Sequence, residues 1–181
     1  VDGGQSWIAR KFEAAPAPGA PPVSAEDAEF APDYHLNRIV GAGTRLYIAA
    51  EAGQLYRSDD GGASWQTLPS PYNGSFFGLL ALDGEVLLAF GLRGNLFRSE
   101  DAGQTWTAVN TGSSAMLTDG VRLGPADLAI VGLSGSVLRS SDLGRSWTTS
   151  QQPDRKGLSA VIAAANGGLI AVGEGGARRI A

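Results

Sequence analysis

The stretch SDDGGASW, residues 58–65, decides the fold, because the same pattern returns twice at a fixed interval. It reads SEDAGQTW at residues 99–106 and SSDLGRSW at residues 140–147, so each closing tryptophan follows the previous one by 41 residues. A shortened copy, DGGQSW, occupies residues 2–7. A period of about 40 residues indicates stacked supersecondary units, among which the blades of a β-propeller are leading candidates.

Each repeat also contains short apolar runs that precede the cassette. One set of runs lies at residues 46–50, 86–90, 128–132 and 169–173, and a second set lies before it at residues 36–40, 76–82, 116–123 and 158–165. Apolar runs of this length, bounded by glycine, indicate buried strands. One strand leads into each cassette and another begins at its tryptophan, which makes four antiparallel strands per unit. We therefore predict an all-β propeller with blades near residues 35–68, 75–109, 115–150 and 158–181.

The cassette has a structural interpretation at the turn between the third and fourth strands. The aspartate carboxylate accepts backbone N–H groups of the turn, and the glycine two positions later takes a positive φ at little cost. The tryptophan begins the outer strand and buries its ring between sheets. The residues assigned this structural role are Asp2, Trp7, Ser58, Asp60, Gly62, Trp65, Ser99, Asp101, Gly103, Trp106, Ser140, Asp142, Gly144 and Trp147.

The pattern Ser-x-Asp-x-Gly-x-Ser/Thr-Trp resembles the Asp-box, or bacterial neuraminidase repeat. The fuller unit, in which Gly-x-Leu-x-Arg-Ser leads into the box, looks most like the bacterial relatives of the photosystem II assembly-factor propellers. Related repeats occur in sialidases, xyloglucanases and sorting receptors. The resemblance implies an extracytoplasmic, periplasmic location with a leader outside this chain.

The first two tryptophans are 58 residues apart, which places a 17-residue insertion in the Pro-rich segment 10–34. This segment is predicted to be a polyproline-like loop. Two ring sizes fit the repeats. Residues 1–9 complete the last blade in a closed four-bladed ring, or the four blades belong to a larger ring. We favour the larger ring, because the chain begins inside a cassette and Asp-box propellers usually have about six to eight blades.

Composition excludes several classes of protein. The net charge is −4 and basic residues form no stripe interleaved with aromatic residues, which argues against nucleic acid as a partner. No apolar run approaches the length of about 18 residues that a membrane-spanning helix needs. The chain has no cysteine and one histidine, His35, so no metal or other cofactor is predicted.

Two groups of residues are candidates for binding. The loops on the rim away from the Asp-boxes differ between blades, which is where a repeat protein encodes specificity. Their candidate residues are Arg93, Tyr72, Asn73, Glu51, Glu174 and Arg155. Arg57, Arg98 and Arg139 recur at the repeat spacing and suit a carboxylate or an acidic peptide. Alternatively, each of these three arginines braces its own Asp-box turn or stacks on a neighbouring ring.

Two enzymatic functions are alternatives. Sialidase chemistry needs three convergent arginines and a Tyr–Glu pair, and only Arg38, on an inner strand, stands out as a candidate. Glycoside hydrolysis needs two carboxyl groups across a cleft, and the rim offers Glu51, Glu174, Asp33 and Asp154. We predict instead a non-catalytic protein-binding propeller, an assembly or accessory factor of a cell-envelope complex with a membrane-complex subunit as partner. The alternative is a glycoside hydrolase or carbohydrate-binding propeller.

Overall fold

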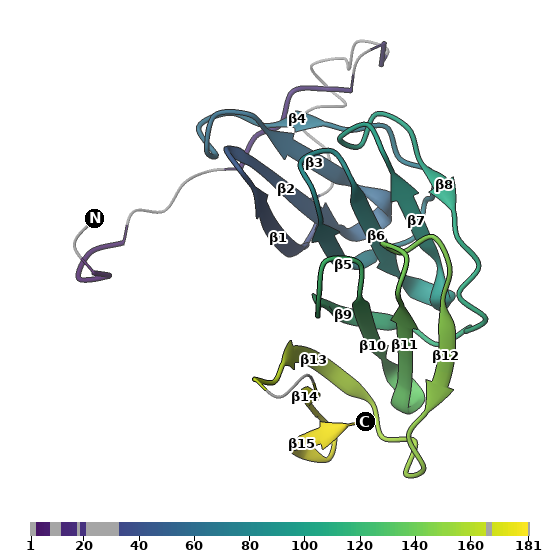
Figure 1. Ribbon diagram of the computed structural model, residues 1–181. Helices are drawn as coiled ribbons and strands as arrows, with labels where there is room; N and C mark the ends of the chain where they lie inside the picture. The colour runs from purple at the N-terminus through teal and green to yellow at the C-terminus, as the bar shows by residue number, and fades with distance from the viewer. Residues whose placement is uncertain (1–2, 8–11, 18, 21–32, 166–167, 181) are drawn as a thin grey trace.

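The computed structural model describes residues 3–7, 12–17, 19–20, 33–165 and 168–180. Its strands form four antiparallel sheets, three with four strands and one with three, and each sheet is one sequence repeat. Figure 1 shows the sheets following one another along an arc, so we call them blades 1 to 4. The predicted all-β propeller class is therefore confirmed.

Strands run in order from the inner to the outer edge within each blade. Blade 1 contains β1 (Leu36–Ala42), β2 (Arg45–Ala50), β3 (Leu55–Ser58) and β4 (Gln66–Thr67). Blade 2 contains β5 (Phe76–Ala81), β6 (Leu87–Gly91), β7 (Leu96–Ser99) and β8 (Thr107–Ala108). Blade 3 contains β9 (Leu117–Arg122), β10 (Leu128–Gly132), β11 (Ser136–Ser140) and β12 (Thr148–Gln151). Blade 4 contains β13 (Leu158–Ala163), β14 (Leu169–Gly173) and β15 (Gly176–Ile180).

The core lies between consecutive blades. The second strands β6 and β10 are buried along their whole length, as expected for apolar runs covered on both faces. Tyr47 and Leu55 of blade 1 pack against Phe76 and Leu79 of blade 2 in one cluster. Equivalent clusters join blade 2 to blade 3 and blade 3 to blade 4. Each blade therefore buries its apolar faces only with its neighbours, which explains why the sequence repeats as it does.

Each complete Asp-box is a closed hydrogen-bond network. In the second box the Ser99 hydroxyl donates to Asp101 Oδ1 at 2.8 Å and accepts from Gly103 N at 2.8 Å. The second half of the turn is held by Thr105, whose N–H and hydroxyl donate to the two carboxylate oxygens of Asp101 at 2.8 and 2.6 Å. The boxes at residues 58–65 and 140–147 repeat these bonds. The predicted role of the carboxylate as a turn clasp is confirmed.

The box backbone also contains two consecutive residues at positive φ. The predicted glycines Gly62, Gly103 and Gly144 have φ of 92°, 87° and 79°. The residue before each of them is left-handed as well, although in two boxes it is Ala102 or Leu143, with φ of 58° and 59°. The sequence pattern did not indicate this second position, because only one of the three complete boxes has a glycine there.

Because of these networks, the stability of the fold should depend on pH in the acid range. Hydrogen bonds from Ser146 and Ser140 lower the pKa of Asp142 from 3.8 to about 2, and the equivalent bonds from Ser64 and Ser58 lower the pKa of Asp60 further. A carboxyl group with a depressed folded-state pKa stabilises the fold fully above its unfolded pKa, and this contribution is lost as pH falls through the folded pKa.

We expect the stability advantage of the parent over Asp142→Asn to be constant from about pH 7 to about pH 4.5. Below that range the advantage shrinks, because the Asp142 carboxyl of the unfolded chain takes up a proton first. Urea unfolding of both proteins at about pH 7, 4, 3 and 2.5 measures this difference. A difference that stayed the same down to about pH 2.5 would contradict the role of the ionised carboxylate.

The tryptophans of the complete boxes lie where the pattern predicts but are only half-buried. Trp106 packs against the cluster between blades 1 and 2, and its Nε1–H donates to Pro69 O at 3.1 Å. Trp147 packs against the cluster between blades 2 and 3. The expectation that these rings are buried between sheets holds only in part, because each ring packs against an inter-blade cluster but stays partly exposed.

The described part of the Pro-rich insertion is not entirely a loop. Ala15 pairs in parallel with Gln66 of β4, through Ala15 N–H to Trp65 O at 2.8 Å and Thr67 N–H to Ala15 O at 2.8 Å. Phe12 stacks edge-on against Tyr56 with ring centroids 4.9 Å apart. Residues 12–15 therefore cover the outer edge of blade 1, which corrects the prediction of a polyproline-like loop at this point. Residues 21–32 lie outside the described residues.

Blade 4 differs from the others because β15 has no outer strand among the described residues. The shortened cassette lies elsewhere: Trp7 is 89% exposed, and residues 3–7 belong to none of the four sheets. Asp2 lies outside the described residues. Completion of blade 4 by residues 1–9, and with it a closed four-bladed ring, is thus not seen in the structure. The predicted domain boundaries stay predictions.

Candidate functional site

The two rims of the arc are built from different connections. Turns η1 (Glu51–Gly53), η2 (Leu92–Gly94) and η3 (Leu133–Gly135) join the second and third strands. These turns lie against the connections between blades. Gly94, for example, approaches its neighbour so closely that a Cβ atom added to it would lie 1.9 Å from Ser113 O. On the other rim, the Asp-box turns bond to the first hairpins, as in Ala102 N–H to Glu85 O at 2.9 Å. We call the first surface the loop rim and the second the box rim.

The tips of the loop-rim turns are held in a tight, left-handed conformation. In η2, Arg93 has φ 59° and ψ 27°, Gly94 has φ 71°, and Asn95 N–H donates to Leu92 O at 3.2 Å. These are the dihedral angles of a type I′ turn, which matches the twist of a hairpin. Ala52 and Ser134 occupy the equivalent tip positions in η1 and η3. The turns therefore present different side chains on one rigid backbone geometry.

A groove of about 590 Å³ lies on the loop rim between blades 2 and 3. Its lining contains no ionisable side chain and is rich in hydroxyl groups. The lining residues are Gly112, Ser113, Ser114, Ala115, Ser134, Ser136, Thr149, Ser150 and Gln151. Three of them belong to β12, the outer strand of blade 3, so the groove runs beside a strand edge. We call it the hydroxyl groove.

Two exposed arginines flank the hydroxyl groove. Arg93 adjoins Gly94, which packs against Ser113 on one wall. Arg155 has a left-handed backbone, with φ 52°. It lies against Gly135, the neighbour of Ser134 in the other wall, since a Cβ atom added to Gly135 would lie 3.1 Å from Arg155 Cα. Among the described residues, neither guanidinium group has a hydrogen bond or ion pair with another side chain. Two predicted binding residues that are 62 positions apart in the sequence thus adjoin opposite walls of one groove.

Three of the four acidic candidates of the loop rim, Glu51, Asp154 and Glu174, have partners. Glu51 Oε2 lies 3.0 Å from His35 Nδ1, and this hydrogen bond lowers the pKa of Glu51. Asp154 is paired with Arg178, which lowers the pKa of Asp154. Glu174 accepts Gly157 N–H at 2.9 Å. Asp33 is exposed.

The other predicted rim residues are separated from the hydroxyl groove. Tyr72 is half-buried and stacks on Phe97 with ring centroids 5.8 Å apart, so it is a packing residue of the connection between blades 1 and 2. Asn73 is exposed on the same connection. Glu51 and Glu174 lie at the two ends of the arc, in blades 1 and 4.

The repeated arginines join consecutive blades instead of forming an open patch. Arg57 Nη1 donates to Ala102 O at 3.4 Å, and Arg98 Nε donates to Leu143 O at 3.1 Å. Each acceptor is the left-handed residue in the Asp-box of the next blade. Arg57 and Arg98 therefore brace the box of the next blade, and they also pair with Asp59 and Glu100 of their own boxes, as the bracing alternative expected. Arg139, the third member, is half-buried and lines a groove of about 450 Å³ beside Leu123 and Asp127.

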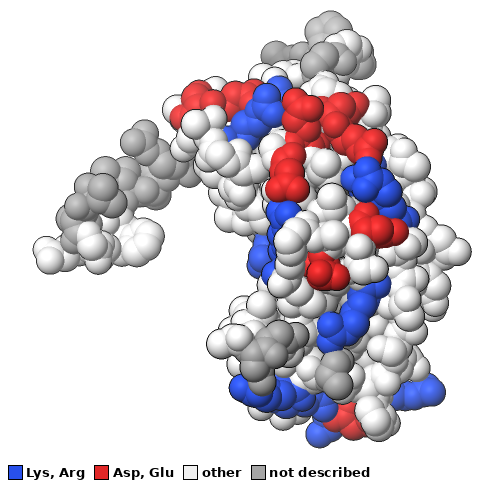
Figure 2. All heavy atoms as spheres, in the orientation of Figure 1, with Lys and Arg blue, Asp and Glu red and all other residues white. Residues whose placement is uncertain are grey.

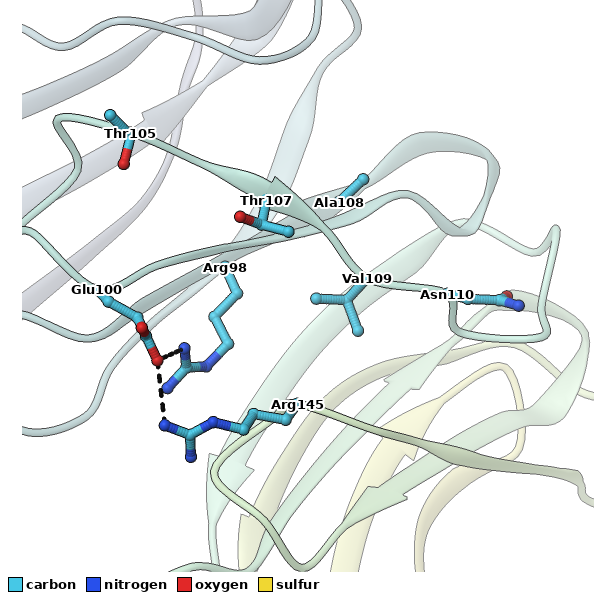
Figure 3. Close-up of a pocket in the computed structure, with 8 residues that line it drawn as sticks. All are labelled: Arg98, Glu100, Thr105, Thr107, Ala108, Val109, Asn110 and Arg145. Atoms are coloured by element: carbon cyan, nitrogen blue, oxygen red, sulfur yellow. Dashed lines mark hydrogen bonds and ion pairs between the residues drawn. The ribbon is translucent and has the colours of Figure 1, made fainter.

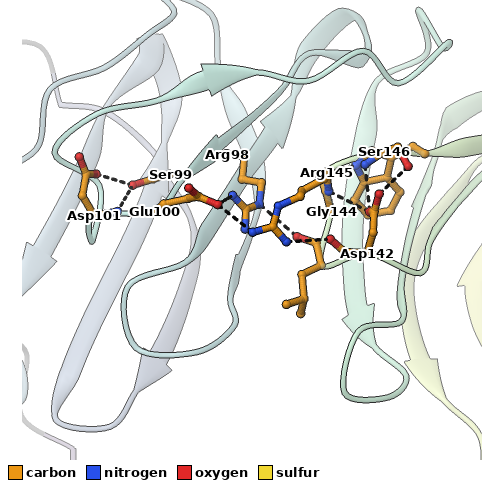
Figure 4. A network of polar contacts seen from close by, with 10 residues as sticks. Arg98, Ser99, Glu100, Asp101, Asp142, Gly144, Arg145 and Ser146 are labelled. Carbon is orange, nitrogen blue, oxygen red and sulfur yellow. Dashed lines mark hydrogen bonds and ion pairs between the residues drawn. The ribbon is translucent and has the colours of Figure 1, made fainter.

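A second polar pocket, of about 420 Å³, lies near the box rim between blades 2 and 3 (Figure 3). Glu100 bridges Arg98 and Arg145, and both contacts lower the pKa of Glu100. Figure 4 shows that this bridge connects the second Asp-box to the third. The Arg98 side chain is only 7% exposed. Its charge is thus already engaged, so this pocket is a weaker candidate for a ligand than the hydroxyl groove.

The inner strands contain an ion pair that pattern reading missed. Asp119 of β9 is 6% exposed, and its carboxylate accepts Gly120 N–H at 2.8 Å and Val161 N–H of β13 at 2.9 Å. Arg38 Nη1 of β1 lies 3.3 Å from Asp119 Oδ1. The unusual Arg38 therefore points to the inner side of the arc, where a single aspartate links it to blades 3 and 4. Among the described residues, no other arginine forms an ion pair with Asp119.

Charge is distributed unevenly along the arc. Figure 2 shows acidic side chains gathered over the first blades and basic side chains gathered at the end that carries blade 4. The basic residues there include Arg155, Lys156 and Arg179, all exposed. Within the described part of the chain, no helix is long and apolar enough to cross a membrane.

Comparison with known proteins supports the repeat assignment. Residues 56–67 match the family model described as BNR/Asp-box repeat. No curated protein matches the chain in sequence. Among solved structures, YCF48 from Cyanidioschyzon merolae is 19% identical, with a TM-score of 0.67, and the match covers 97% of this chain and 56% of that one.

Two further structures illustrate the range of functions on this fold. YCF48 bound to a D1 peptide is 17% identical with a TM-score of 0.58, and the match covers 80% of this chain and 52% of that one. An ancestral GH74 enzyme is 13% identical with a TM-score of 0.56, and the match covers 81% of this chain and 25% of that one. The chain thus spans about half the length of the YCF48 structures. At these identities the likeness demonstrates a shared propeller fold.

Proposed function

We propose that this chain is a non-catalytic propeller that binds an extended, acidic segment of another polypeptide in the hydroxyl groove. The observation that carries the proposal is the pairing of an uncharged, hydroxyl-lined groove with two unengaged arginines at its flanks. Hydroxyl groups and the neighbouring edge of β12 suit the backbone N–H and C=O groups of an extended chain. Arg93 and Arg155 suit carboxylates on either side of it, because a guanidinium group binds a carboxylate through two parallel hydrogen bonds.

A solved relative of the fold supports a polypeptide as the ligand class. One YCF48 structure similar to this chain contains a bound D1 peptide. By analogy we propose an accessory role in assembling a protein complex of the cell envelope, outside the cytoplasm. This part of the proposal rests on fold similarity, whereas the ligand chemistry rests on the groove.

Glycoside hydrolysis is the second candidate, because a GH74 enzyme shares the fold. A glycosidase needs one carboxyl group with a raised pKa as general acid and a second one across the cleft. On the loop rim the pKa shifts of Glu51 and Asp154 have the opposite sign. The hydroxyl groove itself is lined by no carboxyl group. These observations favour binding over hydrolysis.

Selection from a phage-displayed library of random dodecapeptides against the whole chain tests the proposal. We expect enrichment of peptides with Asp or Glu near both ends of a small, uncharged centre. Selected peptides should then bind Arg93→Gln and Arg155→Gln at least about tenfold more weakly in fluorescence anisotropy, since each variant removes one charge-assisted pair.

Arg145→Gln is the matched control, because Arg145 is an exposed arginine of the box rim. Its peptide affinity should equal that of the parent. Equal losses in all three variants would indicate non-specific attraction between charges and would overturn the groove assignment. Release of reducing sugar ends from xyloglucan by the parent, unaffected by Arg93→Gln, would instead support the glycosidase alternative.

A further inference from the structure

Arg57 and Arg98 occupy the same position in successive blades, but their guanidinium groups are not equally satisfied. In blade 1 every guanidinium nitrogen of Arg57 has a partner, because Nη1 donates to Ala102 O while Nε and Nη2 both lie 3.1 Å from Asp59 Oδ2. Oriented with its oxygen toward these donors, the Gln66 amide also accepts from Nε at 3.1 Å and from Nη2 at 2.7 Å. This second acceptor comes from the residue opposite Arg57 on β4.

Blade 2 has a shorter residue at the position of that acceptor. Thr107 stands opposite Arg98 on β8, where blade 1 has Gln66, and no hydrogen bond joins the two side chains. Arg98 donates from Nε to Leu143 O and from Nη1 to Glu100, but its Nη2 is buried and has no hydrogen-bond partner among the described residues. A buried donor without an acceptor is destabilising, so a ligand oxygen placed there would gain a strong hydrogen bond.

The unsatisfied nitrogen belongs to a side chain that lines the pocket of about 420 Å³ between blades 2 and 3. Figure 3 shows Arg98, Glu100 and Arg145 converging at one end of this pocket beside Thr107, while Asn110 lies at the other end. The Arg98 side chain is 7% exposed, whereas the side chains of Glu100 and Arg145 are 61% and 58% exposed. These two exposed side chains can therefore turn outward and admit a ligand to Arg98.

The converging side chains leave an excess of positive charge. Two guanidinium groups, of Arg98 and Arg145, share the single oxygen Oε1 of Glu100, so the three side chains carry a net charge of +1. The nearby carboxylates of Asp101 and Asp142 are already bonded within their own Asp-box turns (Figure 4). A second anion at this end of the pocket would thus be attracted, and it would compete with the Glu100 carboxylate for the two guanidinium groups.

The available donors are single and come from different side chains. Arg98 Nη2, Arg145 Nε and the Thr107 hydroxyl have no hydrogen bond within the part of the chain that the structure describes. A carboxylate pairs best with two parallel N–H groups of one guanidinium group, and Arg98 no longer offers two. A tetrahedral oxyanion directs its oxygens to several sides and accepts single donors from each.

We propose that this end of the pocket binds a tetrahedral oxyanion, either a free phosphate or sulfate ion or the phosphate group of a small molecule. Arg98 Nη2, Arg145 and Thr107 bind its oxygens, and one oxygen replaces the acceptor that Gln66 supplies in blade 1. The site lies near the box rim and is separate from the hydroxyl groove, so it goes beyond the proposed function and does not depend on it.

Isothermal titration calorimetry of the 181-residue chain with sodium phosphate, at neutral pH and constant ionic strength, tests the proposal. We expect saturable binding with a dissociation constant below about 5 mM. Glucose 6-phosphate distinguishes the two sources, because it should bind as tightly as phosphate if the site accepts an ester and more weakly if the ligand is the free ion. Sodium acetate should bind at least about tenfold more weakly than phosphate, since it lacks the tetrahedral oxygens.

Four variants separate this site from general attraction between charges. Thr107→Gln copies the residue of blade 1 and keeps every charge, yet it should weaken phosphate binding at least about tenfold, because the new amide satisfies Arg98. Arg145→Gln should weaken binding by a similar factor. Glu100→Gln should strengthen it at least about threefold, because it removes the competing carboxylate. Arg179→Gln, which changes an exposed arginine of blade 4, should leave the affinity unchanged.

Arg98 itself is retained in all four variants, because it also braces the third Asp-box. Absence of saturable heat up to about 20 mM phosphate would overturn the proposal, as would a Thr107→Gln variant with the affinity of the parent. Equal losses in Arg145→Gln and Arg179→Gln would assign the binding to non-specific attraction. Acetate bound as tightly as phosphate would overturn the tetrahedral oxyanion in favour of a carboxylate.

Discussion

Gly94→Ala is expected to lower the free energy of unfolding by about 3 kcal/mol, combining left-handed strain with a backbone clash. Gly94 has φ 71°, a conformation that costs alanine about 1 kcal/mol. In addition, the new Cβ would lie 1.9 Å from Ser113 O and 2.7 Å from Ser113 C. Because both atoms belong to the backbone of the connection between blades 2 and 3, either η2 or that connection must move.

Gly84→Ala is the matched control for this substitution. Gly84 lies in the first hairpin of the same blade with φ 62°, and a Cβ there would meet nothing within 4 Å. Its free energy of unfolding should fall by only about 1 kcal/mol, the cost of placing alanine in a left-handed conformation. Urea unfolding measures both values, and equal losses would show that the close approach of η2 to Ser113 contributes nothing. The Gly94 variant should also bind groove peptides more weakly, because Ser113 lines the hydroxyl groove.

Asp119→Ala should destabilise the fold by about 3 kcal/mol, because it leaves polar groups on two other blades without their partner. Val161 is 4% exposed, so its N–H cannot exchange the lost carboxylate for bulk water. Arg38 would keep a positive charge at a site where its Nε is already buried without a partner. Loss of an acceptor from a buried donor costs more than the net value of the original bond.

Two further variants separate the contributions of Asp119. Asp119→Asn retains an oxygen acceptor and removes the charge, so an intermediate loss of about 1–2 kcal/mol is expected. Asp127→Ala removes an exposed aspartate of the same blade and should change stability by less than about 0.5 kcal/mol. Thermal or urea unfolding gives all three values. An Asp119→Ala variant as stable as Asp127→Ala would contradict the role of Asp119 in linking blades 1, 3 and 4.

The repeat and its turn chemistry were readable from the sequence, because they depend on local interactions. The Ser99, Asp101 and Thr105 network closes within seven residues, so its spacing is visible in the chain. Apolar runs such as residues 128–132 became β10 at the same bounds, because a strand buried on both faces needs uninterrupted apolar side chains. How deeply the tryptophans are buried could not be predicted from the sequence, since it depends on how far the next blade extends.

The candidate site was predictable only in part. Arg93 and Arg155 were identified as rim residues from the order of the strands, but their meeting at one groove depends on how blades 2 and 3 pack. Tyr72 was selected by the same reasoning and is a packing residue instead. Asp119 was missed because Gly78 and Ala160 occupy its position in the neighbouring repeats, so the period gives no signal there.

The sequence by itself determined the blade, its four-strand order and the clasped turn, because all three arise from residues close together in one repeat. The tertiary structure decided which side chains remain available for other molecules. Arg57 and Arg98, on the third strands, bond to the next blade, whereas Arg93 and Arg155, on the loop rim, have no hydrogen bond or ion pair with another side chain among the described residues. The physical reason is that a charge is free or engaged according to contacts between blades, and those contacts join residues about 40 or more positions apart.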